Sequence, residues 1–373
     1  MLAIHTKIVP WREWPQWAPS YAKLLERSGI VSVFLTPEWI SEWLAVYGET
    51  LEPDLLFFFE GRPLDPIREA PVGGCLVVRR QRKMVRTIHL NCDGEDEADS
   101  TYIEYNHLVA LPAQQAAVAL ALAAYFQRQE WDRLIISGAG EQSALDCVTA
   151  ELGRTEVESR PCHFVDLKHL REHGRPYADV ISGNTRKQNK FTQRQFERIL
   201  GGECQLEFAK TPDEMRAYLL QLAELHNATW RARGKQGLFG SERFVAFHQK
   251  LISKLGPRGE VLLIRLRCAD RAVAVLYCLL HQRRVYFYQS GIDYGIDKRL
   301  RPGFLTLTLA IEALRERADI DEFDFLAGDA QYKRSLGPQK RKLRWITVWS
   351  PSLTSGALQK LRRLRNVVGS WSD

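Results

Sequence analysis

The sequence lacks a hydrophobic run long enough to cross a membrane. Its longest uninterrupted apolar run, 116–126, has eleven residues, whereas a membrane-spanning helix needs about 20. We therefore expect this run to form a buried helix. The N-terminus also lacks the basic segment, apolar stretch and small-residue cleavage site of a secretory signal. These two absences predict a cytoplasmic protein.

Motifs for metals, dinucleotides and nucleotide hydrolysis are missing as well. The seven cysteines form no C-x-x-C pair and have no histidine at zinc spacing, so we expect reduced, mostly buried thiols. Neither G-x-G-x-x-G nor G-x-x-x-x-G-K-[ST] occurs, so redox and nucleotide-hydrolysing functions lack their usual sequence support. Segment 91–105 holds six acids and no base, but in no recognisable ligand register. We expect no metal.

The composition is that of a folded, basic protein. At 373 residues and 42.9 kDa the chain is long enough for two domains. Hydrophobic residues make up 45% and charged residues 26%, which argues against disorder. The net charge of +7 favours anionic ligands. Segment 184–200, with five bases and one acid, carries much of this excess.

Hydrophobic periodicity predicts an α/β (α+β) chain whose halves repeat one plan of strands, helix and strand. In the first half we expect strands at 54–59, 73–80, 84–90 and 132–137 and a helix at 113–129. In the second half we expect helices at 184–200, 212–231, 241–255 and 303–318 and strands at 260–268, 272–281, 284–290, 321–326 and 342–349. The halves join near "ESRPCHFVDL".

A basic turn precedes the helix expected near Pro302 and Gly303. A helix N-terminus offers unpaired N–H groups and the positive end of its dipole, and Lys298, Arg299 and Arg301 add full charges. These features suit a diphosphate, although a solvated basic surface explains them equally well. The helix face containing Phe304, Leu307, Ile311 and Leu314 is expected to pack on the sheet.

The helix expected at 212–231 places Leu222, His226 and Trp230 on one face. A basic, glycine-punctuated loop with Arg231, Arg233 and Lys235 follows. This loop is interpreted either as a cover over an anion or as solvated surface, and the residues alone favour neither interpretation.

Together, five stretches resemble the CelD-like branch of the GNAT acyltransferases, which is related in fold to the FemABX aminoacyltransferases. The stretches are "FLTPEWISEWLAVYGE", "SGNTRKQNKFTQRQFERI", "ELHNATWRARGKQGLFGSERFVAFHQKLI", "RPGF" and "FDFLAGDAQYKRSLG". The resemblance implies two tandem GNAT-like domains, each a mixed, mostly antiparallel sheet flanked by helices. We place a degenerate domain at 1–165, the acyltransferase domain at 166–350 and a basic helix or tail at 351–373.

The resemblance also implies an acyl-CoA donor bound by the second domain. Pantetheine would run along strand 284–291, which contains Ser290, and the diphosphate would lie against segment 298–304. The implied donor-binding residues of that segment are Lys298, Arg299, Leu300, Arg301, Pro302, Gly303 and Phe304. Pro302 stands where the family more commonly has glycine, which leaves the identity of the acyl carrier open.

The stretch 321–337 would then lie beside the thioester. Tyr332 could protonate the departing thiolate, Lys333 could stabilise oxyanion charge, and Asp329 or His226 could accept the proton of the amine. The competing interpretations are a sheet-capping tyrosine, a surface lysine, a turn aspartate and a core histidine. Residues expected to contact the substrate are Trp230, Arg233 and Asp324.

Three functions remain open at this stage. The first is acyl-CoA-dependent N-acylation, acetylation above all, of a small amine or amino sugar, with polysaccharide or envelope metabolism as one setting. The second replaces the donor by aminoacyl-tRNA, contacted by 184–200 and the basic tail, although no long heptad insertion is present. The third is a non-catalytic scaffold whose helix at 357–371 contacts an anionic membrane or a partner, or simply docks on its own domain. No stable DNA binding is expected.

Overall fold

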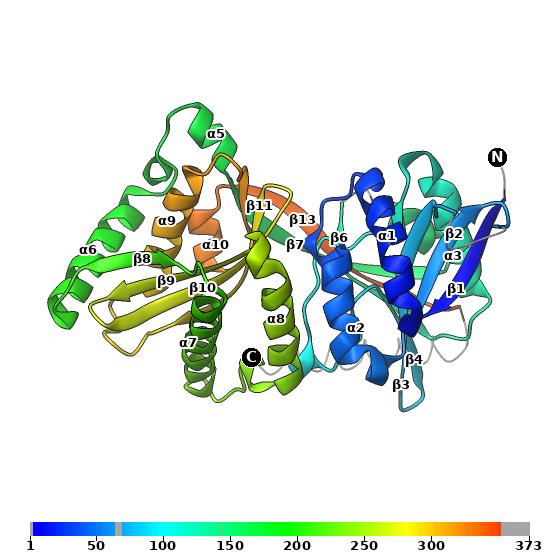
Figure 1. Ribbon diagram of the computed structural model, residues 1–373, viewed down its shortest axis with the longest axis horizontal. Coiled ribbons are helices and arrows are strands. Elements are labelled where there is room, and N and C mark those ends of the chain that lie inside the picture. Colours follow the sequence, from blue (N-terminus) through cyan, green and yellow to red (C-terminus); the bar gives the residue numbers. More distant parts are fainter. Residues whose placement is uncertain (1–2, 64–68, 142, 352–373) are drawn as a thin grey trace. The chain divides into compact units, whose positions relative to one another are not determined.

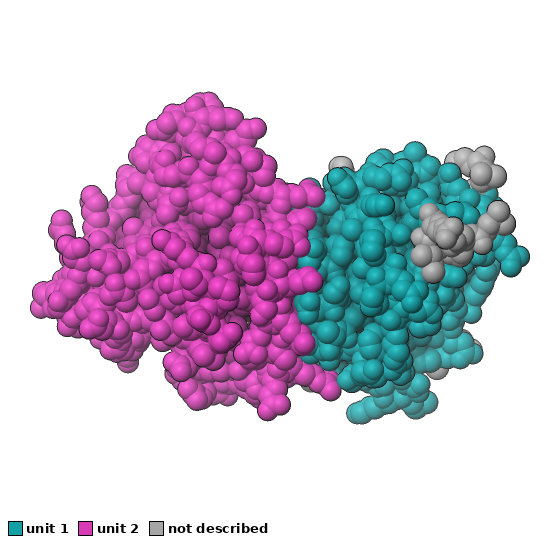
Figure 2. All heavy atoms as spheres, in the orientation of Figure 1, with its two compact units in different colours: residues 1–96, 100–159, 343–373 teal, residues 97–99, 160–342 magenta. Residues whose placement is uncertain are grey.

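The computed structural model describes residues 3–63, 69–141 and 143–351, traced in Figure 1. The chain forms two compact units (Figure 2). Unit 1 contains Met1–Asp96, Ser100–Ser159 and the chain from Leu343 onward, and unit 2 contains Glu97–Asp99 and Arg160–Lys342. The basic helix expected at 357–371 lies outside the described residues.

Unit 1 is built on a sheet with the strand order β1-β2-β3-β4-β6-β13, and β5 pairs with β3 beside it. Its strands are β1 (Ile4–Pro10), β2 (Asp54–Glu60), β3 (Gly73–Arg82), β4 (Val85–Leu90), β5 (Val109–Ala110), β6 (Arg133–Gly140) and β13 (Gln339–Trp349). Its helices are α1 (Trp14–Ser28), α2 (Pro37–Leu51), α3 (Gln115–Gln127) and α4 (Leu145–Ala150), with short 3-10 helices η1 (Trp11–Glu13), η2 (Val33–Leu35) and η4 (Pro112–Gln114).

Unit 2 is built on a sheet with the strand order β8-β9-β10-β11-β12-β7. Its strands are β7 (Arg154–Asp166), β8 (Cys204–Phe208), β9 (Val261–Cys268), β10 (Arg271–His281), β11 (Arg284–Ile292) and β12 (Glu322–Ala327). Its helices are α5 (Leu167–Glu172), α6 (Gly183–Leu200), α7 (Pro212–Arg231), α8 (Glu242–Leu255), α9 (Pro302–Arg315) and α10 (Gln331–Leu336), with η3 (Glu97–Asp99), η5 (Tyr177–Asp179), η6 (Leu238–Gly240) and η7 (Gly256–Arg258). In Figure 1, α7 and α8 lie on one face of this sheet and α6 and α9 on the other.

Local sequence signals explain where the long helices begin. Thr36, Ser182 and Thr211 each accept a backbone hydrogen bond as the N-cap of α2, α6 and α7. In α7, Glu214 completes a capping box with Thr211. These caps satisfy N–H groups that a helix start otherwise leaves unpaired.

The two units share one pattern of strand pairing. In each, three antiparallel pairs are followed by one parallel pair and a last antiparallel pair. The parallel pair is only three residues long in both units: β4 pairs with β6 at Thr87–His89, and β11 pairs with β12 at Arg284–Tyr286. Among the described residues, no register pairs beyond these join the two strands of either parallel pair, so the strands separate at corresponding places in the two sheets.

Each unit takes its last strand from the other half of the sequence. The strand β7, which follows the unit 1 elements, pairs with β12 of unit 2, whereas the C-terminal strand β13 pairs with β6 of unit 1. The units therefore divide at 159/160 and 342/343. The sequence analysis placed the domain ends at 165 and 350, because the exchange of strands has no local signal.

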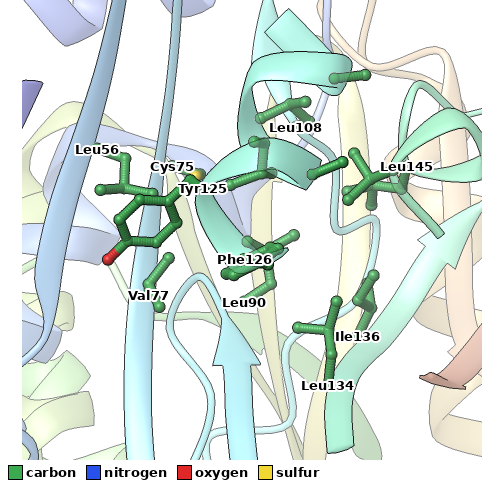
Figure 3. Close-up of a cluster of buried hydrophobic side chains, with 14 of the residues drawn as sticks. Leu56, Cys75, Val77, Leu90, Leu108, Tyr125, Phe126, Leu134, Ile136 and Leu145 are labelled. Atoms are coloured by element: carbon green, nitrogen blue, oxygen red, sulfur yellow. The ribbon is translucent and has the colours of Figure 1, made fainter. Parts of the chain in front are cut away.

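The apolar run 116–126 forms most of α3, as expected, but only one face of this helix lies in the core of unit 1: Val118 and Leu122 are buried, whereas Leu120 is 52% exposed. Figure 3 shows Tyr125 and Phe126 of α3 among strand side chains that include Leu56, Cys75 and Val77. In unit 2, Leu307, Ile311 and Leu314 of α9 are at most 3% exposed and Phe304 packs at the edge of the same cluster. The predicted sheet-facing side of α9 is therefore confirmed.

The expectation that all cysteines are reduced is wrong for one pair. Cys204 of β8 and Cys268 of β9 are register partners, and their sulfur atoms are 2.00 Å apart in a disulfide. They are 64 residues apart in the sequence, so only the pairing of the strands brings them together. The other cysteines are free thiols, buried except for Cys147.

The described residues contain no helix with both the length and the apolar character that a membrane span requires.

Candidate active site

The segment between β11 and α9, residues 293–301, is called the donor loop below. It is held by its own side chains: the guanidinium of Arg299 lies 2.7 Å from the carboxylate of Asp297, whose Oδ1 also accepts the N–H of Arg299. These hydrogen bonds lower the pKa of Asp297 to about 2. The charge of Arg299 is therefore matched by Asp297, which leaves Lys298 and Arg301 to supply the positive charge of the loop.

Helix α9 begins without a side-chain cap. Arg301 is its N-cap residue, Pro302 follows in the first turn, and no side chain of Arg301 caps the helix. N–H groups of a first turn have no partner within the helix, so those of Gly303 and Phe304 carry the positive end of the helix dipole. A side chain at Gly303 would place its Cβ 2.7 Å from Cδ1 of Ile292. Glycine therefore permits the start of α9 to lie against β11.

A β-bulge and a second glycine shape the end of β11. Tyr277 of β10 pairs with Gln289 and Cys278 pairs with Phe287, so Tyr288 is the extra residue on β11. A Cβ at Gly291 would lie 2.3 Å from the carbonyl oxygen of Leu222 in α7. Because Gly291 has no side chain, α7 packs directly on the end of β11, close to the start of the donor loop.

This packing brings His226 of α7 to the backbone of Ser290. The carbonyl oxygen of Ser290 lies 3.1 Å from Nδ1 of His226 and only accepts hydrogen bonds, so Nδ1 carries the proton. Burial lowers the pKa of His226, so the ring is neutral at pH 7. Its Nε2 is therefore an acceptor, and it has no hydrogen-bond partner among the described residues. Phe239 and Trp230 flank the ring at 5.2 and 6.0 Å between centroids.

The strand β12 ends in a second bulge, where the register shifts between Asp324 and Ala327. Asp324 is fully buried; its Oδ1 accepts the N–H of Leu326 at 2.7 Å and lies 3.0 Å from Sγ of Cys162. Lys333, 9% exposed, donates from Nζ to the carbonyl oxygens of Leu326 and Ala327 at 3.1 and 2.5 Å. The sequence analysis assigned Asp324 to substrate binding and Lys333 to oxyanion stabilisation. In the structure both side chains hold the bulge, because its turned backbone exposes polar groups that burial would otherwise leave unpaired.

Replacing Lys333 by methionine is expected to lower the free energy of unfolding by about 3 kcal/mol, because two buried carbonyl groups lose a charged donor. Urea unfolding followed by circular dichroism measures this loss. Lys250→Met, at an exposed position of α8, serves as the matched control and should change stability by about 0.5 kcal/mol or less. Equal stability of Lys333→Met and the wild type would contradict the structural role of Lys333.

The bulge directs the chain into α10, which carries Tyr332 in its first turn. The Tyr332 ring packs 6.2 and 6.4 Å from the rings of Phe325 and Phe287. Burial, and to a lesser extent Tyr294, raise the pKa of Tyr332. The phenol is therefore protonated at neutral pH and can donate a proton.

Asp329 lies in the turn before α10 and is exposed. Its carboxylate is 2.9 Å from the guanidinium of Arg334 and 3.5 Å from Nε2 of His163. The hydrogen bond from Arg334 lowers the pKa of Asp329, which makes the carboxylate a weaker base. Burial likewise lowers the pKa of His226, so both predicted bases are weakened.

Two residues of this region were missed by the sequence analysis. The first is Tyr294 of the donor loop. Its hydroxyl oxygen lies 3.9 Å from where a Cβ on Gly303 would be. Its phenol adds to the effect of burial in raising the pKa of Tyr332. Burial raises the pKa of Tyr294, and the charge of Arg233 offsets part of that rise. The guanidinium of Arg233 lies 5.5 Å from the ring centre of Trp230. The second missed residue is His163 of β7, whose Nε2 lies 3.5 Å from the carboxylate of Asp329. An aromatic residue beside the predicted phosphate turn was a usable signal for Tyr294, whereas nothing in the sequence links His163 to position 329.

Tyr294 lies near Gly303, and Tyr332 packs on Phe287 and Phe325, the residues of β11 and β12 just beyond their last register pair. His226 and Ser290 lie on the α7 side of β11. Across residues 3–63, 69–141 and 143–351, histidine, cysteine and acidic side chains nowhere form a group of three or more that could hold a metal ion.

Residues 183–334 match the family profile described as acetyltransferase (GNAT) domain. This segment is a GNAT acetyltransferase domain. The domain extends from the start of α6 into α10, so it contains the donor loop, His226 and Tyr332. The chain is accordingly an acyltransferase, and the predicted GNAT resemblance is confirmed. Its assignment to the CelD-like branch stays a prediction.

No curated protein sequence matches this chain. Among solved structures, FemX aligns over 92% of this chain and 96% of its own, with 9% identity and a TM-score of 0.56. A conserved protein of unknown function from Bacteroides thetaiotaomicron aligns over 93% of this chain and 100% of its own, with 11% identity and a TM-score of 0.50. Both alignments span the two units. With the GNAT domain of residues 183–334, they confirm the predicted fold class.

Proposed function

We propose that this GNAT enzyme is an acyl-CoA-dependent N-acyltransferase, with acetyl-CoA as its donor and a small amine or amino sugar as its acceptor. The observation that carries the proposal is the uncapped N-terminus of α9, which lies beside Tyr294 and Tyr332 where β11 and β12 separate. An anion on α9 and a reacting group beside Tyr332 fit the two ends of one acyl-CoA molecule. Polysaccharide or envelope metabolism is the setting that the sequence resemblance suggests.

In this proposal the donor diphosphate binds the first turn of α9. The N–H groups of Gly303 and Phe304 and the charges of Lys298 and Arg301 would hold it. Arg299 is less suited to this task because Asp297 already pairs with it. Pantetheine would then run along the free edge of β11 beyond Tyr286, where β12 no longer pairs with it.

The reaction needs a base for the amine and an acid for the departing thiolate. Neutral His226 would take the proton from the attacking amine through a water that reaches its Nε2 when the acceptor binds; in this structure Nε2 is buried and has no hydrogen-bond partner among the described residues. The new N–C bond forms as the C–S bond breaks, and Tyr332 would give its proton to the thiolate. Asp329, whose carboxylate pairs with Arg334, is the alternative base.

Trp230 and Arg233 would form the acceptor side of the site. The guanidinium of Arg233 lies over the Trp230 ring, and both residues are at least partly exposed. An aromatic face with an adjacent cation suits a sugar ring bearing an acidic or hydroxyl group. Asp324 is excluded from this role because it is fully buried.

Calorimetric titration with acetyl-CoA and CoA tests the proposal. Micromolar binding of both is expected, followed by thiol release when amino sugars or small amines are added. Absence of binding at millimolar CoA, in protein shown to be folded by circular dichroism, would reject the proposed donor.

Aminoacyl-tRNA is the second candidate donor. The basic residues Lys187, Lys190 and Arg194 are exposed along α6, and lysine and arginine contacts to RNA phosphates make affinity fall steeply with salt. Salt-dependent tRNA binding together with no CoA binding would favour this donor.

A further inference from the structure

A histidine of β7, His163, lies outside the segment that matches the GNAT profile and has no role in the mechanism above. It stands opposite the bulge of β12. Asp324 pairs with Phe164, and Ala327 pairs with Cys162, so two residues of the bulge lie opposite His163 alone. The residue is only 7% exposed. A buried imidazole needs hydrogen-bond partners, and the two ring nitrogens of His163 face the two ends of α10.

At the C-terminal end of α10, the carbonyl oxygen of Gly337 lies 3.1 Å from Nδ1 of His163. Because a carbonyl oxygen only accepts hydrogen bonds, Nδ1 carries a proton and donates it. A Cβ at Gly337 would lie 2.9 Å from Cβ of His163 and 3.0 Å from the backbone nitrogen of Phe164. Glycine at position 337 therefore allows the end of α10 to lie directly against β7.

At the N-terminal end of α10, Nε2 of His163 lies 3.5 Å from Oδ1 of Asp329. With one proton on Nδ1, a neutral ring would set two acceptors opposite each other, because a carboxylate also only accepts. A proton on Nε2 turns this contact into an ion pair, for which 3.5 Å is within range. Nε2 is buried and has no hydrogen-bond partner in the part of the chain that the structure describes. It is therefore available to Asp329.

Helix α10 depends on such contacts because it has only six residues and no side-chain N-cap. A helix of this length is not stable by itself. Arg334, the other charged group at Asp329, pairs with it at 2.9 Å, and the Tyr177 hydroxyl donates to the carbonyl oxygen of Leu336 at 2.6 Å. Each of these contacts acts at one end of the helix, whereas His163 contacts both ends.

We propose that His163 is a positioning residue, which holds both ends of α10 and thereby sets where the phenol of Tyr332 lies. Tyr332 is in the first turn of α10, three residues after Asp329, so a shift of that turn moves the phenol. This inference rests on the proposed function, in which Tyr332 protonates the departing thiolate. A misplaced proton donor slows the chemical step without weakening donor binding, so the effect is expected in kcat and not in KM.

Three substitutions of His163 in the full-length protein test the proposal. His163→Ala removes both contacts and should lower kcat for thiol release about tenfold, with KM for acetyl-CoA unchanged. His163→Asn keeps an N–H near the position of Nδ1, and His163→Gln keeps one near the position of Nε2. Each should restore part of the lost kcat. Wild-type kcat in His163→Ala would overturn the proposal, as would asparagine and glutamine variants no faster than the alanine variant.

The matched control is His173→Ala on α5. His173 is exposed, and its Nδ1 also lies close to a backbone carbonyl oxygen, that of His169 at 2.8 Å. The variant loses the same kind of contact away from α10 and should keep wild-type kcat. If His163→Ala does not fold, the asparagine and glutamine variants decide the test by themselves.

A double-mutant cycle shows whether His163 acts through Tyr332. In a Tyr332→Phe background the phenol is already absent, so adding His163→Ala should lower kcat further by less than about twofold. A second tenfold loss would mean that His163 acts on another group, which would overturn the proposal.

Hydrogen exchange of residues 328–337 provides a readout that does not depend on activity. The N–H groups of Arg334 and Gly337 donate to the carbonyl oxygens of Ala330 and Lys333 within α10. His163→Ala should speed their exchange about tenfold, because the helix opens locally more often. Unchanged exchange would overturn the proposal and leave the N-acyltransferase function intact. If the wild type binds no CoA and acylates no amine, the proposed function fails, while the exchange measurement still tests whether His163 holds α10.

Discussion

Replacing Gly291 by valine is expected to destabilise unit 2 by about 3 kcal/mol, the upper end of typical overpacking costs. A Cβ at this position would lie 2.3 Å from the carbonyl oxygen and 2.9 Å from Cα of Leu222. Both are backbone atoms of α7, so no side-chain rotation relieves the overlap. Either α7 moves away from β11, or β11 loses some of its backbone hydrogen bonds to β10.

The same displacement is expected to disturb the proposed site, because the hydrogen bond between His226 and the Ser290 carbonyl depends on the contact of α7 with β11. Urea unfolding measures the stability change, and calorimetry with CoA measures the functional one. Gly183→Ala is the matched control: the nearest atom to its Cβ is a terminal nitrogen of Arg186 at 3.6 Å. It should leave stability within about 1 kcal/mol of the wild type. A stable Gly291→Val variant would show that α7 does not lie directly on β11.

Replacing Tyr332 by phenylalanine is expected to lower kcat for acyl transfer about 100-fold or more, because the thiolate loses its proton donor. The ring contacts with Phe325 and Phe287 remain. KM for the acyl donor and the unfolding temperature should therefore change little. Steady-state thiol release with an accepted amine measures both kinetic constants.

The control for this variant is Tyr218→Phe, whose hydroxyl contacts Glu207 at 3.3 Å and should not affect kcat. The raised pKa of Tyr332 adds a pH test. The phenol should stay protonated at least up to its ordinary pKa near 10, so alkaline pH below that value should not reduce its contribution. Wild-type kcat in Tyr332→Phe would remove Tyr332 from the proposed mechanism.

The predicted secondary structure agrees with the structure wherever local pattern dominates. The helices expected at 184–200 and 212–231 are present as Gly183–Leu200 and Pro212–Arg231. The basic turn before Pro302 does lead into a helix without a side-chain cap. The short strands β1 and β8 and the helix α10 were not predicted, because segments of five to seven residues carry too little periodicity. The 15-residue helices α1 and α2 and the 13-residue strand β7 were not predicted either.

Residue roles were harder to predict than elements. Asp324 of β12 and Lys333 of α10 are charged residue types on either side of a turn that suggests chemistry, yet both are buried and hold a β-bulge. Their partners are backbone groups, and which backbone groups lie unpaired depends on the three-dimensional path of the chain. Tyr294 was passed over although its place beside the predicted phosphate turn was a usable signal; only its position relative to Gly303 and Tyr332 required the folded structure.

The sequence by itself determined the alternation of strands and helices, the buried face of α9 and the positive charge at its start, because each depends on residues within a few positions of one another. The tertiary structure alone decided the exchange of β7 and β13 between units, the Cys204–Cys268 bond and the backbone partners of Lys333. These features join residues distant in the sequence, and their energies arise only when folding brings the partners into contact.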